Sequence, residues 1–171
     1  GGNYDITAVY GYDAKTGDIY YQAAALGATD RQVYVTHKNG KTQRLSDKEG
    51  WNSAMFSGDY QYFINTWSDY NTPYVFTTRN REGRVISTLE DNKSLRKLVD
   101  EYGFCKREPF TFTTSEGVKL NGWMMKPQNF DAKKKYPVIM HQYSGPGSQQ
   151  VTNSWSAGSM GNGGAFDSYL A

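Results

Sequence analysis

The chain has 171 residues, and its 19 Lys and Arg nearly balance its 17 Asp and Glu, which leaves a formal net charge of +2. The one basic run, Lys133–Lys135, is typical of a solvated turn before a strand, so the charge indicates no nucleic-acid partner, and no apolar stretch approaches membrane-spanning length. A single cysteine, Cys105, and two scattered histidines exclude an internal disulfide and a Cys/His metal site, and we expect neither a metal nor another cofactor.

The first half of the chain carries a repeat. Gly17–Tyr21 recurs 41 residues later as Gly58–Tyr62, and Val33–Thr36 recurs at the same spacing as Tyr74–Thr77. A period of about 40 to 45 residues with about four short strands in each unit is typical of β-propeller blades, although a generic antiparallel meander fits the same pattern. Three turn signals separate the predicted strands: Asp13–Gly17, Lys38–Lys41 and Asn80–Gly83.

Two predicted blades are too few for a propeller ring, which needs at least about four. We therefore expect the chain to be a fragment of a longer protein. It starts with Gly1 rather than Met, and residues 163–171 have the spacing of a helix without a stop signal. Exposed strand edges on such a fragment predict a homodimer or another form of self-association.

One amphipathic helix is predicted from Lys93 to Tyr102, with Asp91 or Asn92 as its cap and a glycine after its end. We take this helix as a domain boundary. Residues 1–102 would be the C-terminal part of a propeller with its linking helix, and residues 103–171 would begin a second domain. The predicted apolar face of the helix consists of Leu95, Leu98, Val99 and Tyr102.

A β-hairpin is predicted after the helix. Residues 110–114 and 118–126 alternate apolar and polar side chains around the turn Ser115–Gly117. Asn121 and Gly122 interrupt the second arm, and we interpret them as a β-bulge.

The segment Tyr136–Gln150 has the pattern of a buried strand followed by a glycine-rich loop. Val138–Met140 is a short apolar run behind Pro137, and a Gly-Pro-Gly sequence at 145–147 breaks it. A run without polar alternation suits a strand covered on both faces, as in the parallel sheet of an α/β domain. Because ligands of such sheets bind beyond the carboxyl ends of the strands, we expect chemistry at residues 141–144, although a plain buried strand and turn fits as well.

This segment resembles the start of the catalytic domain in the prolyl oligopeptidase family of serine peptidases, in particular its dipeptidyl peptidase IV group. In that group Tyr-Pro and an apolar strand precede Tyr-(Ala/Ser)-Gly-Pro and Ser-Gln, and here the residues are Tyr-Pro-Val-Ile-Met-His-Gln-Tyr-Ser-Gly-Pro-Gly-Ser-Gln. The resemblance extends back through Leu89–Asn92 and Gly122–Pro127. It implies a mainly β fold, with about two four-stranded propeller blades followed by the opening strands and first helix of an incomplete α/β-hydrolase domain.

Tyr143 is the residue that we expect to act in catalysis. A phenol with a pKa of about 10 is protonated at neutral pH and can donate a hydrogen bond to an oxygen that gains charge in acyl transfer. By resemblance, Tyr143 is the side-chain half of an oxyanion hole, and Ser144 and Gly145 form the substrate-binding loop beside it. His141 is expected to be a packed or hydrogen-bonded wall residue. The family's catalytic Ser, Asp and His, and its paired Glu residues for the substrate's amino terminus, have no matching positions in this chain.

We therefore predict a fragment of a serine-type dipeptidyl peptidase, itself inactive, whose parent protein releases N-terminal X-Pro or X-Ala dipeptides from peptide substrates. The resemblance alone implies a periplasmic, extracellular or cell-surface location. A tripeptidyl or acylaminoacyl peptidase of the same family fits the residues too. So does a non-enzymatic module that binds carbohydrate or peptide, with stacking surfaces from Trp51, Trp67, Tyr70 and Trp123.

Overall fold

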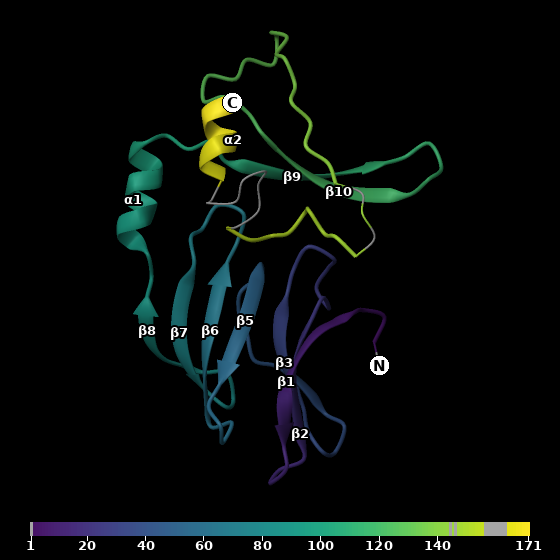
Figure 1. Ribbon diagram of the computed structural model, residues 1–171, viewed down its shortest axis with the longest axis vertical. Helices are drawn as coiled ribbons and strands as arrows, with labels where there is room; N and C mark the ends of the chain where they lie inside the picture. Colours follow the sequence, from purple (N-terminus) through teal and green to yellow (C-terminus); the bar gives the residue numbers. More distant parts are fainter. Residues whose placement is uncertain (1, 144, 146, 156–163) are drawn as a thin grey trace.

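The computed structural model describes residues 2–143, 145, 147–155 and 164–171. These residues form a mainly β structure with two four-stranded antiparallel sheets, a two-stranded hairpin and two short helices (Figure 1). The first sheet contains β1 (Ile6–Asp13), β2 (Asp18–Ala23), β3 (Gln32–Thr36) and β4 (Thr42–Arg44), and the second contains β5 (Trp51–Phe56), β6 (Tyr62–Ser68), β7 (Val75–Asn80) and β8 (Val85–Glu90). The hairpin is β9 (Arg107–Thr113) and β10 (Lys119–Met125), and the helices are α1 (Lys93–Glu101) and α2 (Ala165–Leu170).

Both four-stranded sheets are meanders in which the spatial order of the strands follows the chain. Each strand pairs antiparallel with the next, so each sheet has the topology of a propeller blade, and the predicted fold class is confirmed. The structural repeat is slightly longer than the spacing of the sequence motifs. β2 begins directly after Gly17, whereas additional turn residues follow Gly58 before β6 begins at Tyr62.

The main hydrophobic core lies between the two sheets. Tyr20 and Val33 from the first sheet pack with Phe63 from the second, and each of these side chains is at most 2% exposed. The ring of Tyr20 also stacks on that of Tyr60, with the ring centroids 4.9 Å apart. The two sheets therefore bury their facing sides against each other, as neighbouring propeller blades do.

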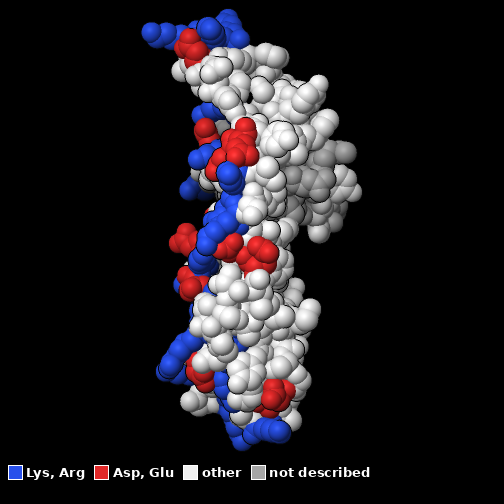
Figure 2. All heavy atoms as spheres, turned by 90° about the vertical axis from the view of Figure 1, so that its left-hand side faces the viewer, with Lys and Arg blue, Asp and Glu red and all other residues white. Residues whose placement is uncertain are grey.

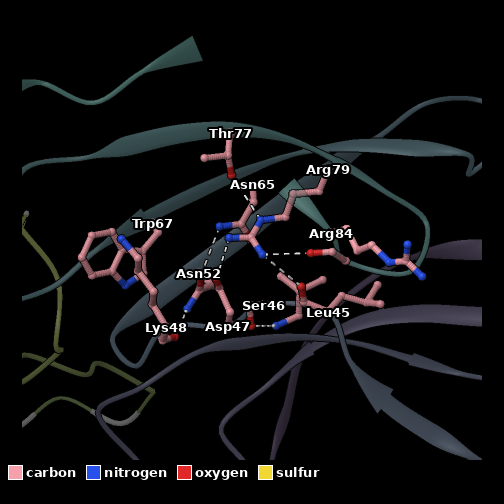
Figure 3. Close-up of polar contacts among 12 residues, drawn as sticks. Leu45, Ser46, Asp47, Lys48, Asn52, Asn65, Trp67, Thr77, Arg79 and Arg84 are labelled. Atoms are coloured by element: carbon pink, nitrogen blue, oxygen red, sulfur yellow. Dashed lines mark hydrogen bonds and ion pairs between the residues drawn. The ribbon is translucent and has the colours of Figure 1, made fainter. Parts of the chain in front are cut away.

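A buried polar network also joins the two sheets (Figure 3). The fully buried Asn52 donates from Nδ2 to the carbonyl oxygen of Arg31 at 3.1 Å and accepts at Oδ1 from Asn65 Nδ2 at 3.2 Å. Nearby, Arg79 is 4% exposed and donates from Nη2 to Asp47 Oδ1 at 2.6 Å. Because buried polar groups are stable only when they are paired, these hydrogen bonds favour one alignment of the two sheets.

Gly83 in the β7–β8 turn is expected to tolerate alanine much less well than Gly40 in the β3–β4 turn. Both residues have positive φ angles, 86° and 84° respectively. A Cβ atom at Gly83 would lie 2.5 Å from the carbonyl oxygen of Leu45, whereas nothing lies within 4 Å of one at Gly40. We expect Gly40→Ala to lower the free energy of unfolding by about 1 kcal/mol and Gly83→Ala by about 3 kcal/mol. Urea denaturation measures both losses, and equal losses would contradict this prediction.

Helix α1 forms where the sequence predicts it, at Lys93–Glu101. Of the two predicted caps, Asp91 contacts the first turn, because its Oδ1 accepts a hydrogen bond from the Lys93 amide at 3.0 Å. The Asn92 side chain instead donates to the carbonyl oxygen of Tyr74 at 2.6 Å. Within the part of the chain that the structure describes, no side chain of α1 is buried: Leu95 and Leu98 on its apolar face are exposed, and Val99 is half-buried.

The hairpin β9–β10 is confirmed, but the predicted β-bulge at Asn121 and Gly122 is wrong, because the two strands pair without a register shift. Gly122 pairs directly with Phe110, whose ring lies over it, and a Cβ atom at Gly122 would be 2.5 Å from Phe110 Cζ. The glycine therefore makes room for a cross-strand aromatic ring and does not interrupt the strand.

Residues 136–143 do not form the predicted strand. None of them belongs to a strand, and Val138, Ile139 and Met140 are 88%, 74% and 82% exposed. A strand of a parallel sheet takes its hydrogen bonds and both covering layers from segments that are distant in sequence, and no described segment supplies them here. The apolar run alone is therefore insufficient to create the strand.

Charged side chains gather along one edge of the view in Figure 2, where Lys and Arg are interleaved with Asp and Glu. This mixture of signs produces no single-sign patch of the kind that attracts nucleic acid on that side of the molecule. Among the described residues, no helix is both long and apolar enough to cross a bilayer.

Candidate functional site

Tyr143 lies at the end of the exposed segment 136–143, and 62% of its surface is open to solvent. Its ring lies against Gly145, since a Cβ atom on that glycine would be 2.6 Å from Tyr143 Cε1. Glycine therefore lets the phenol ring approach the backbone that follows it. His141 is exposed rather than packed into a wall. Ser144, the remaining predicted site residue, lies outside the described residues.

A few residues after Tyr143, the chain is attached to the first sheet through Gln149. Its side chain donates from Nε2 to the carbonyl oxygen of Ala28 and accepts at Oε1 from Arg31 Nη2, both at 2.6 Å. Arg31 is 7% exposed, and its Nη1 donates to the carbonyl oxygens of Ala28 and Asp30 at 2.9 and 2.8 Å. Burial lowers the pKa of Arg31, and nearby carboxylates oppose this shift. The guanidinium of Arg31 is thus fixed by its own hydrogen bonds while it donates to Gln149.

Asn153 makes a second attachment, which involves loops from both sheets. Its N–H donates to the carbonyl oxygen of Thr29 at 2.8 Å, and its Nδ2 donates to Asp30 Oδ1 at 3.1 Å. On its other side, Oδ1 accepts from the N–H of Tyr70 at 3.1 Å. Residues 147–155 consequently pass between the β9–β10 hairpin and the ends of the two sheets (Figure 1).

The β9–β10 hairpin is held on the second sheet by its first residue, Arg107. The N–H of Arg107 donates to Asn71 Oδ1 at 2.9 Å, and Asn71 Nδ2 donates to the carbonyl oxygen of Arg107 at 3.1 Å. The guanidinium of this buried residue donates from Nη1 to the carbonyl oxygen of Tyr70 at 2.6 Å. Burial lowers the pKa of Arg107, and the carboxylate of Asp167 in α2 acts in the opposite direction. Arg107 therefore couples the hairpin to the second sheet and, electrostatically, to α2.

An open pocket of about 380 Å³ lies among these attachments. Its polar groups are hydroxyls and amides, and burial raises the pKa of the Tyr70 hydroxyl, which stays protonated at neutral pH. Such groups can hydrogen-bond a ligand, but they do not combine a nucleophile with a general base. Among the described residues, no three His, Cys, Asp or Glu side chains come together as a possible metal site. The pocket is lined by Thr29, Tyr70, Pro109, Phe110, Thr111, Asn121, Gly122 and Asn153.

The aromatic residues considered for carbohydrate stacking do not form an open platform. Tyr70 is only 8% exposed. Cationic groups of the chain itself lie over the other three rings: Arg31 over Trp51 at 4.5 Å, Lys48 over Trp67 at 4.1 Å and Arg107 over Trp123 at 5.5 Å. These rings therefore each have a face engaged in an internal cation–π contact.

The attachment residues were missed by the sequence analysis, with one partial exception. Gln149 belongs to the Ser-Gln pair of the family resemblance, so that motif was a usable signal. Arg31, Asn153 and Arg107 stand in no motif, and their partners lie far away in the sequence. Their roles become visible only once the sheets and the hairpin are assembled.

Two blade-like sheets with a second structural unit attached at their ends are typical of proteins that join a β-propeller to another domain. The family model described as "Dipeptidyl peptidase IV (DPP IV) N-terminal region" matches residues 1–74. The chain is 31% identical over 161 residues to the dipeptidyl peptidase 4 of Arthroderma otae, and this match covers 91% of the chain and 21% of that protein.

Solved structures give the same result. The crystal structure of Porphyromonas gingivalis dipeptidyl peptidase 4 is 40% identical with a TM-score of 0.86, and the match covers 92% of this chain and 23% of that one. A putative dipeptidyl aminopeptidase IV from Bacteroides ovatus is 26% identical with a TM-score of 0.83, and the match covers 100% of this chain and 24% of that one. The chain is a segment of the dipeptidyl peptidase IV family, and it spans between 21% and 24% of the length of these relatives.

Proposed function

We propose that the full-length protein containing this chain is a serine exopeptidase that removes X-Pro or X-Ala dipeptides from the amino termini of peptides. The observation that carries this proposal is the similarity to the putative dipeptidyl aminopeptidase IV of Bacteroides ovatus, which covers 100% of this chain and so includes the segment that contains Tyr143. Residues 1–102 would be the end of the propeller with its linking helix, and residues 103–171 would begin the hydrolase domain. From the family resemblance alone, we also propose a periplasmic, extracellular or cell-surface location.

Within this proposal, Tyr143 supplies one donor of the oxyanion hole. Its side chain is 62% exposed, so its hydroxyl can donate to a substrate that binds from outside. As the tetrahedral intermediate forms, the former carbonyl oxygen gains negative charge, and the phenol O–H donates to it. Gly145 leaves room for backbone and substrate to approach the ring, and Ser144 completes the loop.

The catalytic Ser, Asp and His are proposed to come from sequence that this chain does not contain. An oxyanion donor lowers the energy of charge that a nucleophile has created, and by itself it starts no reaction. The isolated chain is therefore inactive in this proposal, although its exposed sheet edges allow it to associate with other copies.

Cleavage of Gly-Pro-p-nitroanilide by the full-length protein and by the isolated 171-residue chain tests this function. We expect release of p-nitroaniline by the full-length protein only, because the chain lacks the matching nucleophile. A panel of p-nitroanilides whose N-terminal segments contain one, two or three residues, including an N-acylated amino acid, separates the dipeptidyl activity from the acylaminoacyl and tripeptidyl alternatives. Activity of the isolated chain, or a full-length protein that hydrolyses none of these substrates, would contradict the proposal.

A further inference from the structure

Asn153 occupies a junction between both sheets and the segment that follows Tyr143. Its backbone N–H reaches the carbonyl oxygen of Thr29, and its two side-chain polar atoms reach Asp30 and the backbone of Tyr70. Both ends of its amide group are therefore used, each with a partner on a different sheet loop. An amide is the side-chain group that donates on one side and accepts on the other in this way.

The partner Asp30 determines which end of the amide must face it. Asp30 Oδ1 accepts from the N–H of Gly50 at 2.6 Å as well as from Asn153, and Oδ2 accepts from Thr29 Oγ1 at 2.9 Å. All of these contacts treat Asp30 as an acceptor, which is what an ionised carboxylate offers. A second carboxylate at position 153 would place two acceptors of like charge at hydrogen-bond distance.

The segments on the two sides of Tyr143 differ sharply in exposure. Residues 138–140, on the N-terminal side, are largely exposed and belong to no strand. On the C-terminal side, Gln149 is bonded to the first sheet, and Ser154 and Trp155 are 3% and 9% exposed. Tyr143 is therefore followed, within a few residues, by a segment that is bonded to the sheets and partly buried.

We infer that Asn153 is a positioning residue, which sets where Tyr143 lies by fixing the following chain to the ends of the two blades. This inference rests on the proposed function, since it assigns a consequence to the position of an oxyanion donor. Because both ends of its amide are bonded to the sheet loops, Asn153 is assigned no direct role toward the substrate. It acts through the backbone, and it couples the geometry of the propeller loops to the site of acyl transfer. A displacement of about 1 Å in such a donor is enough to cost on the order of 10²-fold in rate.

Substitutions of the two interacting side chains test this inference in the full-length protein. Asn153→Asp sets two carboxylates against each other, whereas Asp30→Asn keeps an amide oxygen that can accept from both Gly50 and Asn153. The matched control is Gln150→Ala, because the exposed Gln150 side chain bonds only to Ser148 Oγ among the described contacts. Rates are measured at a temperature where all variants are folded by circular dichroism.

We expect Asn153→Asp to lower kcat by about 10- to 100-fold with little change in KM, and Asp30→Asn to stay within about threefold of the wild type. Hydrogen exchange of residues 147–155 should accelerate in Asn153→Asp and stay normal in Asp30→Asn. An active wild type whose kcat and exchange are unchanged by Asn153→Asp would overturn the inference alone. So would an Asp30→Asn variant as impaired as Asn153→Asp. A wild type without dipeptidyl activity contradicts the proposed function. Hydrogen exchange needs no activity, so unchanged exchange in Asn153→Asp would then separately show that Asn153 does not hold this segment on the sheets.

Discussion

Tyr143→Phe in the full-length protein is expected to lower kcat by about 10²- to 10³-fold and to leave KM nearly unchanged. The substitution removes a single hydroxyl and keeps the ring that lies against Gly145. A donor that matters only when negative charge develops on the substrate oxygen contributes to the transition state and not to substrate binding, which is why kcat carries the loss. Steady-state kinetics on Gly-Pro-p-nitroanilide measures both constants.

Tyr136→Phe is the matched control for that experiment. The Tyr136 hydroxyl accepts a hydrogen bond from the N–H of Asp131 at 2.9 Å, so it has a local structural contact of its own. Its loss should cost about 1 kcal/mol of stability and change kcat by less than about twofold. If Tyr143→Phe and Tyr136→Phe have equal effects on kcat, the phenol of Tyr143 has no special role in catalysis.

Phe63→Ala is expected to lower the free energy of unfolding of the chain by about 3–5 kcal/mol. Phe63 comes from the second sheet, is 2% exposed and packs into the core made with the first sheet, with its ring centroid 4.9 Å from that of Phe56. Truncation removes buried apolar surface and leaves a cavity that two hydrogen-bonded sheets close only in part.

The control for Phe63→Ala is Met55→Ala on β5, where the side chain is 72% exposed. This variant should lose less than about 0.5 kcal/mol. Urea denaturation followed by tryptophan fluorescence and by circular dichroism gives both values and checks that the transition has one step. A loss below about 1 kcal/mol for Phe63→Ala would mean that the two sheets do not share a core in solution.

Features encoded by neighbouring residues could be predicted from the sequence. Helix α1 follows from the spacing of its apolar side chains and from Asp91, whose carboxylate accepts a hydrogen bond from the first turn; both signals lie within one segment. The hairpin turns at Gly40, Gly83 and Gly117 follow from glycines that adopt positive φ angles, as these tight turns require. The blade topology follows from repeating these local units along the chain.

Features that depend on distant residues could not be predicted in the same way. Val138–Met140 has the composition of a buried strand, yet a strand also needs partners, and these residues remain exposed. Gly122 has the local pattern of a bulge, whereas glycine is needed there because the Phe110 ring lies over it from the opposite strand. The hydrogen bonds of Asn153 to Asp30 and Tyr70 likewise could not be predicted from the spacing of neighbouring residues.

In the candidate site, too, some features could be predicted from neighbouring residues and others depend on distant ones. Tyr143 and Gly145 were selected from a motif, and the structure brings their ring and backbone together. The segment that follows them is bonded to the first sheet by Arg31 and Gln149, which pair across most of the length of the chain. Motifs therefore identify a reactive group more readily than they identify what holds it in place.

A crystal structure of the full-length protein with a dipeptide-like boronic acid bonded to its catalytic serine would test the role of Tyr143 most directly. The boronate copies the tetrahedral geometry and negative charge of the acyl-transfer intermediate. We predict one boronate oxygen within about 2.5–3.0 Å of Tyr143 Oη, the range of an O–H donor to a charged oxygen. A boronate whose oxygens are all bound by other groups, with the phenol more than about 4 Å away, would contradict the oxyanion role of this residue.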